Sequence, residues 1–188
     1  MKKIVMMAVM AVAALTANAQ QEAGTFSIQP KAGLNVSSLS GDGTKAKAGF
    51  TAGVEGMYQA TEKFGVSLGV MYSMQGAKSK ANTDLKLNYG YINIPILANY
   101  YVTKGLAIKA GIQPGFMVSA KEKYNNVSHD VKDSCKKFDF SIPVGVSYEI
   151  ANVVFDARYN FGLTKTVKDV EKGKNGVFQF TVGYKFGL

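Results

Sequence analysis

The sequence predicts an all-β fold: an eight-stranded antiparallel up-and-down transmembrane β-barrel with short periplasmic turns and long outer loops. Apolar residues recur at every second position in eight separate stretches, a period that is typical of strands with one polar and one apolar face. Long and short polar segments connect these stretches in strict alternation. Glycine and serine are frequent on the polar face. Together these three observations indicate a barrel of the outer membrane.

The first four strands are expected from apolar series of four to six residues each. In the third, Phe64, Val66 and Leu68 begin a series that continues without a break to Met74. The residues between them fall on the other face, because successive side chains of a strand point to opposite sides. The four series cover residues 26–36, 50–58, 64–74 and 92–100.

The last four strands follow the same pattern. In the stretch VVFDARYNFGL, residues 153–163, six apolar side chains share one face and Asp156 and Arg158 lie on the other. Four prolines fall inside expected strands, where each removes a ladder hydrogen bond, so bulges or strand ends are expected to absorb them. These prolines are Pro30, Pro95, Pro114 and Pro143. The four series cover residues 106–118, 138–148, 153–163 and 178–186.

The connecting segments indicate how the strands are joined. Barrels of the outer membrane have short turns on the periplasmic side and long loops outside. An even number of strands then places both ends of the barrel on the periplasmic side. The long segments are 40–48, 77–86, 120–137 and 164–175, and the short ones are 61–63, 102–105 and 149–152.

The polar face distinguishes a membrane barrel from a soluble one. A soluble, lipocalin-like barrel turns its polar face to water, where large polar side chains are expected. Glycine and serine dominate that face here, which suits the narrow interior of an eight-stranded barrel. Phenylalanine and tyrosine gather near the strand ends of the apolar face, as in the aromatic girdles of membrane proteins. The apolar face is therefore expected to meet lipid.

Residues 1–19 are expected to form a signal peptide, and residues 20–188 the barrel. Two lysines precede an apolar run that is too short to span a bilayer, and Ala-Asn-Ala at 17–19 matches a cleavage site. Export excludes nucleic acid as a partner, although the formal charge is +9, or +7 without the two leading lysines. Cys135 is the single cysteine, so no internal disulfide is expected.

The expected interior contains equal numbers of acidic and basic side chains. They are Lys31, Lys109, Arg158 and Lys185 against Glu55, Asp139, Glu149 and Asp156. A water-filled pore tolerates an excess of either sign, whereas a closed interior needs its charges paired. A closed interior is therefore expected, with one ionic network at mid-depth formed by Lys31, Glu55, Asp156 and Arg158. Loss of Arg158 would then leave both carboxylates without a partner.

The long loops are rich in lysine. With Lys45 and Lys47 of the first loop, they carry a net charge of +7, the whole formal charge of the mature chain. We expect them to bind lipopolysaccharide or acidic polysaccharide, with an affinity that falls as salt screens the charges. The alternative is that these lysines only keep the loops solvated. The expected basic patch comprises Lys78, Lys80, Lys121, Lys123, Lys136, Lys137, Lys165, Lys168, Lys172 and Lys174.

No catalytic, cofactor-binding or metal site is expected, and no cofactor. The segment SHDVKDSC, residues 128–135, contains a contiguous Ser-His-Asp, but the members of a catalytic triad converge from separate elements. A soft metal site there would need a second histidine or cysteine. We therefore expect a non-enzymatic protein that acts in surface interaction or envelope integrity. The alternatives are a small-solute channel and a lipid-modifying enzyme that uses His129 or Ser128.

Three short motifs resemble those of a known family. They are NYGYINIPILANYYV at 88–102, GLNVSSL at 33–39 and GYKF at 183–186. On these motifs the chain resembles the PorT-like outer-membrane β-barrels of the Bacteroidota. The resemblance implies an eight-stranded barrel in the outer membrane and little about activity. Such a barrel is expected to be a monomer whose partners include outer-membrane lipid and, during insertion, the barrel-assembly machinery.

Overall fold

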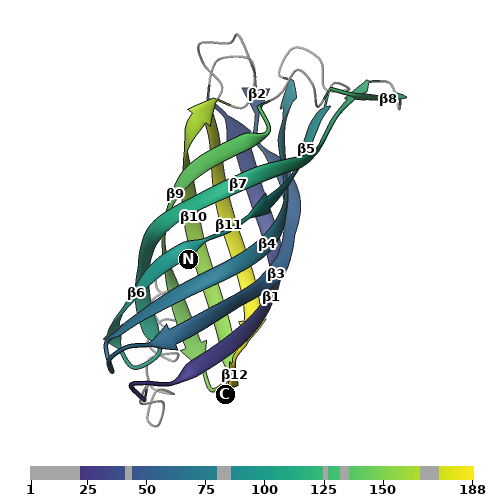
Figure 1. Cartoon of the computed structure of the whole chain (residues 1–188). Coiled ribbons are helices and arrows are strands. Elements are labelled where there is room, and N and C mark those ends of the chain that lie inside the picture. The colour runs from purple at the N-terminus through teal and green to yellow at the C-terminus, as the bar shows by residue number, and fades with distance from the viewer. Residues whose placement is uncertain (1–21, 41–43, 80–85, 125–126, 132–135, 166–173) are drawn as a thin grey trace, which may run out of the picture.

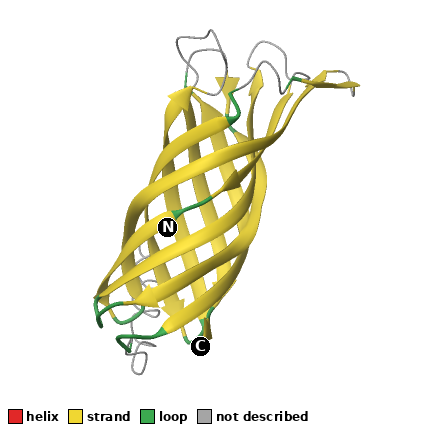
Figure 2. Cartoon of the chain, in the orientation of Figure 1, coloured by secondary structure: helices red, strands yellow, loops and turns green. Residues whose placement is uncertain are grey.

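The computed structural model describes residues 22–40, 44–79, 86–124, 127–131, 136–165 and 174–188. Within these ranges, all of the regular secondary structure is β-strand (Figure 2). The described residues include no helix with the length and apolar character needed to cross a membrane. The expected signal peptide, residues 1–19, lies outside the described residues and stays a prediction.

Twelve strands form within the described residues, and ten of them fill the eight predicted positions, two of which are occupied by two strands in succession. They are β1 (Phe26–Leu39), β2 (Thr44–Lys45), β3 (Lys47–Gln59), β4 (Phe64–Ser79), β5 (Lys86–Asn93), β6 (Ile96–Thr103), β7 (Leu106–Tyr124), β8 (Val127–Asp130), β9 (Phe138–Ile150), β10 (Val153–Lys165), β11 (Lys174–Tyr184) and β12 (Phe186–Gly187).

The long strands form one closed antiparallel sheet (Figure 1). Each pairs with its neighbour around the barrel, and β11 pairs back with β1, so that Phe180 lies opposite Leu34. β5 and β6 share one position in the sheet, because both lie between β4 and β7. β11 and β12 share another beside β1. The predicted eight-stranded antiparallel barrel is therefore confirmed.

Two predicted strands are each split in two, and prolines explain the breaks. Pro95 lies in the gap between β5 and β6, and Pro30 lies beside the place where the pairing of β1 with β11 stops, next to the gap between β11 and β12. Pro114 on β7 accepts a hydrogen bond of 2.9 Å at its carbonyl from the N–H of Ile94. Pro143 lies where the pairing of β7 with β9 is interrupted. All four prolines thus lie at or beside irregular places in the ladder, where a missing N–H costs least.

The two faces of the sheet are arranged in the opposite way to those of a soluble protein. Apolar side chains cover the outside, where Leu34, Leu68 and Val70 are 64%, 57% and 56% exposed. Polar side chains fill the inside, where Glu55 and Thr181 are both 0% exposed. This arrangement excludes the lipocalin-like alternative, because it would expose an apolar belt to water, and it is typical of a barrel surrounded by lipid.

Aromatic side chains mark the two edges of the apolar belt. Near one end, Phe26 lies opposite Tyr58, and Phe64 lies opposite Tyr100. Near the other end, the rings of Phe116 and Phe138 pack edge to face with centroids 5.6 Å apart. Two such bands on the outside of a barrel are the expected positions of the membrane interfaces.

The two ends of the barrel differ in the length of their connections. We call the end with the short turns 60–63, 104–105 and 151–152 the inner end, and the opposite end the outer end. Two of these turns require positive φ, which is 83° at Gly105 and 52° at Ala151. Figure 1 shows β8 projecting beyond the ring at the outer end.

Strands at the outer end continue into segments that were expected to be loops. β4 extends to Ser79, β7 extends to Tyr124, and β8 occupies 127–130, so the expected loops 77–86 and 120–137 are partly strand. The expectation was wrong there because β7 pairs with β5 on one side and β8 on the other. These ladders hold residues in strands whatever the polarity of their side chains.

Candidate functional site: a filled lumen and a basic outer rim

The alternation of each strand carries a group of ionisable side chains into the middle of the lumen. Lys31 comes from β1, Glu55 from β3, Lys109 from β7, and Asp156 and Arg158 from β10. All five residues are buried, with exposed fractions of 4%, 0%, 3%, 1% and 2% in that order. We call these five residues the lumen cluster.

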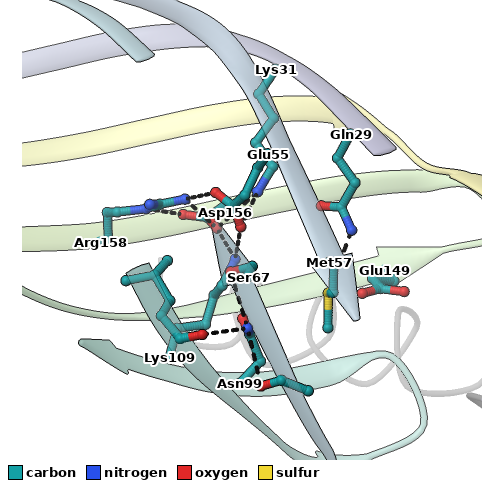
Figure 3. Close-up of polar contacts among 12 residues, drawn as sticks. Gln29, Lys31, Glu55, Met57, Ser67, Asn99, Lys109, Glu149, Asp156 and Arg158 are labelled. Atoms are coloured by element: carbon teal, nitrogen blue, oxygen red, sulfur yellow. Dashed lines mark hydrogen bonds and ion pairs between the residues drawn. The ribbon is translucent and has the colours of Figure 1, made fainter. Parts of the chain in front are cut away.

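Each carboxylate of the lumen cluster contacts all three cations (Figure 3). One oxygen of Glu55 lies 3.1 Å from the amines of both Lys31 and Lys109, and its other oxygen lies 3.1 Å from Arg158 Nη2. Arg158 also donates two hydrogen bonds to Asp156, from Nε at 2.8 Å and from Nη2 at 2.9 Å. Lys109 donates a third to Asp156 at 2.7 Å.

The structure brings together the four residues expected at mid-depth and adds Lys109. That lysine was expected to face inward but not to join the network. Its strand register could have suggested it, because Lys109 and Arg158 both lie opposite Gly145 on β9. The expectation that loss of Arg158 would leave both carboxylates unpaired is wrong, since Lys31 and Lys109 contact both of them.

Glycines on neighbouring strands make room for the long side chains of the lumen cluster. A Cβ atom added at Gly183 would lie 2.7 Å from Cγ of Lys31, and one added at Gly145 would lie 2.7 Å from Cβ of Arg158. Both distances are too short for carbon atoms in contact. The glycines on the polar face therefore set the space into which the charged side chains fold.

A second polar layer lies toward the outer end. The amine of Lys47 donates hydrogen bonds to the side chain of Asn88 and, at 3.4 Å, to the carbonyl of Gln75. Asn175 donates to the side chain of Gln75, and Asn35 donates to Ser73 at 2.8 Å. Lys47 was expected in the first outer loop. It lies instead on β3 and is 8% exposed, so it does not contribute to the basic outer surface.

Beside this layer and above it, the inner side of the sheet is apolar on three strands, which was not expected from the sequence; Tyr91 lies opposite Ser73, and Tyr89 lies opposite Gln75. The buried side chains there come from β4, β5 and β7, the strands that extend furthest at the outer end. Leu87 and Val131 pack against them. The buried members are Ala77, Tyr89, Tyr91, Met117 and Ala120.

A third polar layer lies toward the inner end. The hydroxyl of Tyr101 donates a hydrogen bond of 2.6 Å to Glu149, and Lys185 lies 3.0 Å from the same carboxylate.

Asp139, near the outer end of β9, accepts a hydrogen bond from Thr164. The expected inward position of these charged residues is thus observed, and polar contacts cross the lumen at three levels.

The expected basic patch is described only in part. Lys121, Lys136, Lys137 and Lys174 are described and exposed at the outer end. Lys78, Lys123 and Lys165 belong to strands, but their side chains are not among those described. Lys80, Lys168 and Lys172 lie outside the described residues. The structure therefore places four of the ten lysines on the outer rim and leaves the rest as predictions.

The segment 128–135 shows no converging chemistry in its described part. His129 and Asp130 are exposed on β8, while Asp133 and Cys135 lie outside the described residues. Across the described ranges, no group of three or more His, Cys, Asp and Glu side chains is placed to hold a metal ion.

Comparison with known proteins places the chain in a family. The family model for the outer membrane protein beta-barrel domain matches residues 18–168. No curated protein matches the chain. Among solved structures, Neisserial surface protein A is similar with a TM-score of 0.56 and 17% identity, over 86% of this chain and 97% of that one.

Ail, the attachment invasion locus protein of Yersinia pestis, is similar with a TM-score of 0.54 and 17% identity, over 87% of this chain and 99% of that one. Its structure in complex with the heparin analogue sucrose octasulfate has a TM-score of 0.56 and 15% identity, over the same shares. At these identities the likeness shows the fold. With the family match it establishes that the chain belongs to the outer membrane protein beta-barrel domain family and resides in the outer membrane.

Proposed function

We propose that the protein is a non-enzymatic surface-interaction barrel. Its lumen is closed, and its basic outer rim binds anionic carbohydrate, either the phosphorylated headgroup of lipopolysaccharide or an acidic polysaccharide. The finer PorT-like membership is part of this proposal and rests on the motifs at 33–39, 88–102 and 183–186.

The lumen cluster is the observation that carries the proposal. Five ionised groups on four strands join across the middle of the barrel through contacts of 2.7–3.6 Å. A solute could pass only by separating buried ion pairs, and breaking such pairs costs several kcal/mol. A closed lumen leaves the surface as the place where the protein can act. The closed lumen argues against a small-solute channel, and no other feature of the described residues favours one.

Exposed lysines support a role for the outer rim. Lys136 and Lys137 are adjacent in sequence, and Lys121 and Lys174 lie on strands that reach the same end. Clustered lysines at the level of the headgroups attract anionic groups, and each contributes about 1 kcal/mol near a charged membrane surface. Ail, of similar fold, was solved in complex with the heparin analogue sucrose octasulfate, which supports the idea that a barrel of this architecture can bind a sulfated sugar.

The non-enzymatic part of the proposal rests on the position of the histidine. His129 is the single histidine of the chain and is exposed on β8 at the outer end. A lipid-modifying barrel needs its acid–base group beside an acyl slot in the wall. Unchanged lipid A acylation in cells that carry His129→Ala and Ser128→Ala, relative to the unmutated protein, is the outcome we expect.

Binding of the purified barrel to lipopolysaccharide and to heparin tests the rim. We expect the affinity for at least one of them to fall steeply between 50 and 500 mM salt, because exposed charges are screened over roughly 10 Å at 0.1 M. Changing both Lys136 and Lys137 to glutamine should weaken binding roughly tenfold or more.

The matched control changes two exposed lysines at the inner end, Lys63 and Lys104, to glutamine. This variant has the same net charge as the rim variant and should bind as the unmutated protein does. Equal loss in both variants would show that only net charge matters. Affinity that is indifferent to salt and to all four changes would leave the lysines as solvating groups and refute the proposed function.

A further inference from the structure

The lumen cluster contains more positive than negative charge. Lys31, Lys109 and Arg158 face only two carboxylates, Glu55 and Asp156. Among the described residues, the ion pairs of the cluster join these five side chains to one another only. With every group ionised, the cluster carries a net charge of +1 in an interior that is occupied by polar layers on both sides of it. An uncompensated buried charge is strongly unfavourable.

Three hydrogen-bond donors of this region lack an acceptor among the described residues. They are Nη1 of Arg158, Nζ of Lys31, and Oγ1 of Thr181. Lys31 lies within ion-pair distance of both carboxylates, but its amine makes no hydrogen bond of good geometry. All three residues are at least nine-tenths buried, with exposed fractions of 2%, 4% and 0%. Buried donors without acceptors are rare in folded proteins and point to a missing partner.

The strand register places these three residues on adjacent strands, with Lys31 and Arg158 one inward position to either side of Thr181, and the side chains of Lys31 and Arg158 converge on the same two carboxylates. Thr181 on β11 lies opposite Asp156 on one side and opposite Gly33 of β1 on the other. Arg158 is the next inward residue after Asp156 on β10, and Lys31 is the inward residue before Gly33 on β1. The three donors therefore come from three adjacent strands at neighbouring positions of the inner face.

We propose that these donors bind one small monovalent anion, with chloride as the ion available to an exported protein. Three donors from a hydroxyl, an amine and a guanidinium suit an anion and not a cation. A single negative charge would neutralise the cluster. A small ion is required because polar layers fill the lumen above and below the cluster. The anion is thus a structural part of the plug, separate from the glycan binding proposed for the rim.

The dependence of stability on the type of anion tests this site. The unfolding midpoint of the barrel in detergent is measured as chloride replaces gluconate at constant ionic strength. Binding to the folded state alone raises stability by mass action, so above the dissociation constant each tenfold increase in chloride should raise the midpoint by about 3–5 °C. Screening by salt would give no difference between the two anions.

Two variants make the result specific. Lys31→Met leaves two cations and two carboxylates, so the variant should lose its dependence on chloride even if its midpoint differs. Lys185→Met removes a lysine that pairs with Glu149 near the inner end, and it should keep the dependence. A chloride effect that is equal in both variants would place the ion elsewhere and overturn the proposal.

Crystals grown in bromide provide the direct observation. We expect an anomalous peak within contact distance of Arg158 Nη1, Lys31 Nζ and Thr181 Oγ1. A water at that position, or no peak, would overturn the proposal. So would a stability that ignores the anion and rises with pH through the range of lysine titration, because Lys31 would then remove the excess charge by losing its proton.

Discussion

Replacing Glu55 by glutamine is expected to destabilise the folded barrel by about 3–5 kcal/mol, the usual cost of removing one member of a buried ionic group. Glu55 is 0% exposed and contacts Lys31, Lys109 and Arg158. The amide keeps the shape of the side chain but removes its charge, so three buried cations would share Asp156 alone. The measurement is the free energy of unfolding from urea titration of the barrel folded in lipid or detergent.

Arg158→Gln provides the informative comparison. It also removes one charge from the lumen cluster, but it leaves two cations and two carboxylates, with Lys31 and Lys109 still in contact with both acids. Its cost should be clearly smaller than that of Glu55→Gln. Glu62→Gln, in the exposed turn 60–63, controls for loss of a carboxylate and should leave stability unchanged. Equal costs for the two lumen variants would contradict the charge assignment of the cluster.

Val54→Arg is expected to destabilise the barrel by about 2–4 kcal/mol and to impair its insertion, because it puts a charge on the lipid face at mid-depth. Val54 precedes Glu55 on β3, so the two side chains lie at the same level on opposite faces, and Val54 is 47% exposed on the outside. The measurements are the free energy of unfolding in lipid and the yield of heat-modifiable, folded protein in membranes.

Depth provides the control for this second prediction. Val102 is 50% exposed on the outside of β6, one residue before the end of the strand at the inner end. Because a charge costs about 0–1 kcal/mol near the interface, Val102→Arg should be tolerated. If both variants were equally harmless and folded without detergent or lipid, the outer face would not be a lipid-facing surface.

The alternation of side chains made most of the fold predictable. Each of the predicted strands has a counterpart, and residues such as Glu55, Asp156 and Arg158 face the lumen as the period of two requires. The face that each residue takes is predictable because a shift of one residue would move every apolar side chain of a strand into the lumen. Alternation says nothing about depth, however, so it could not show that Lys109 reaches Glu55 and Asp156 across the lumen.

The ends of the strands were less predictable, for a physical reason. Composition marks 77–86 and 120–137 as loops, yet β4, β7 and β8 extend into them because hydrogen bonds between strands do not depend on side-chain polarity. Lys47 was assigned to a loop for the same reason, although β3 begins at that residue and turns it inward. The break at Pro95 also needed the structure, since proline forbids a ladder bond but does not say how neighbouring strands adjust.

Conductance of the purified barrel in planar lipid bilayers tests the closed lumen most directly. A barrel crossed by the lumen cluster and by polar layers on both sides should give no steady ionic current, although its insertion can be verified by protection from protease. A general porin inserted by the same procedure serves as the positive control. Electrical silence of the inserted barrel is the result expected here. A stable, ohmic open channel in the unmutated protein would contradict the closed lumen and, with it, the assignment of function to the outer rim.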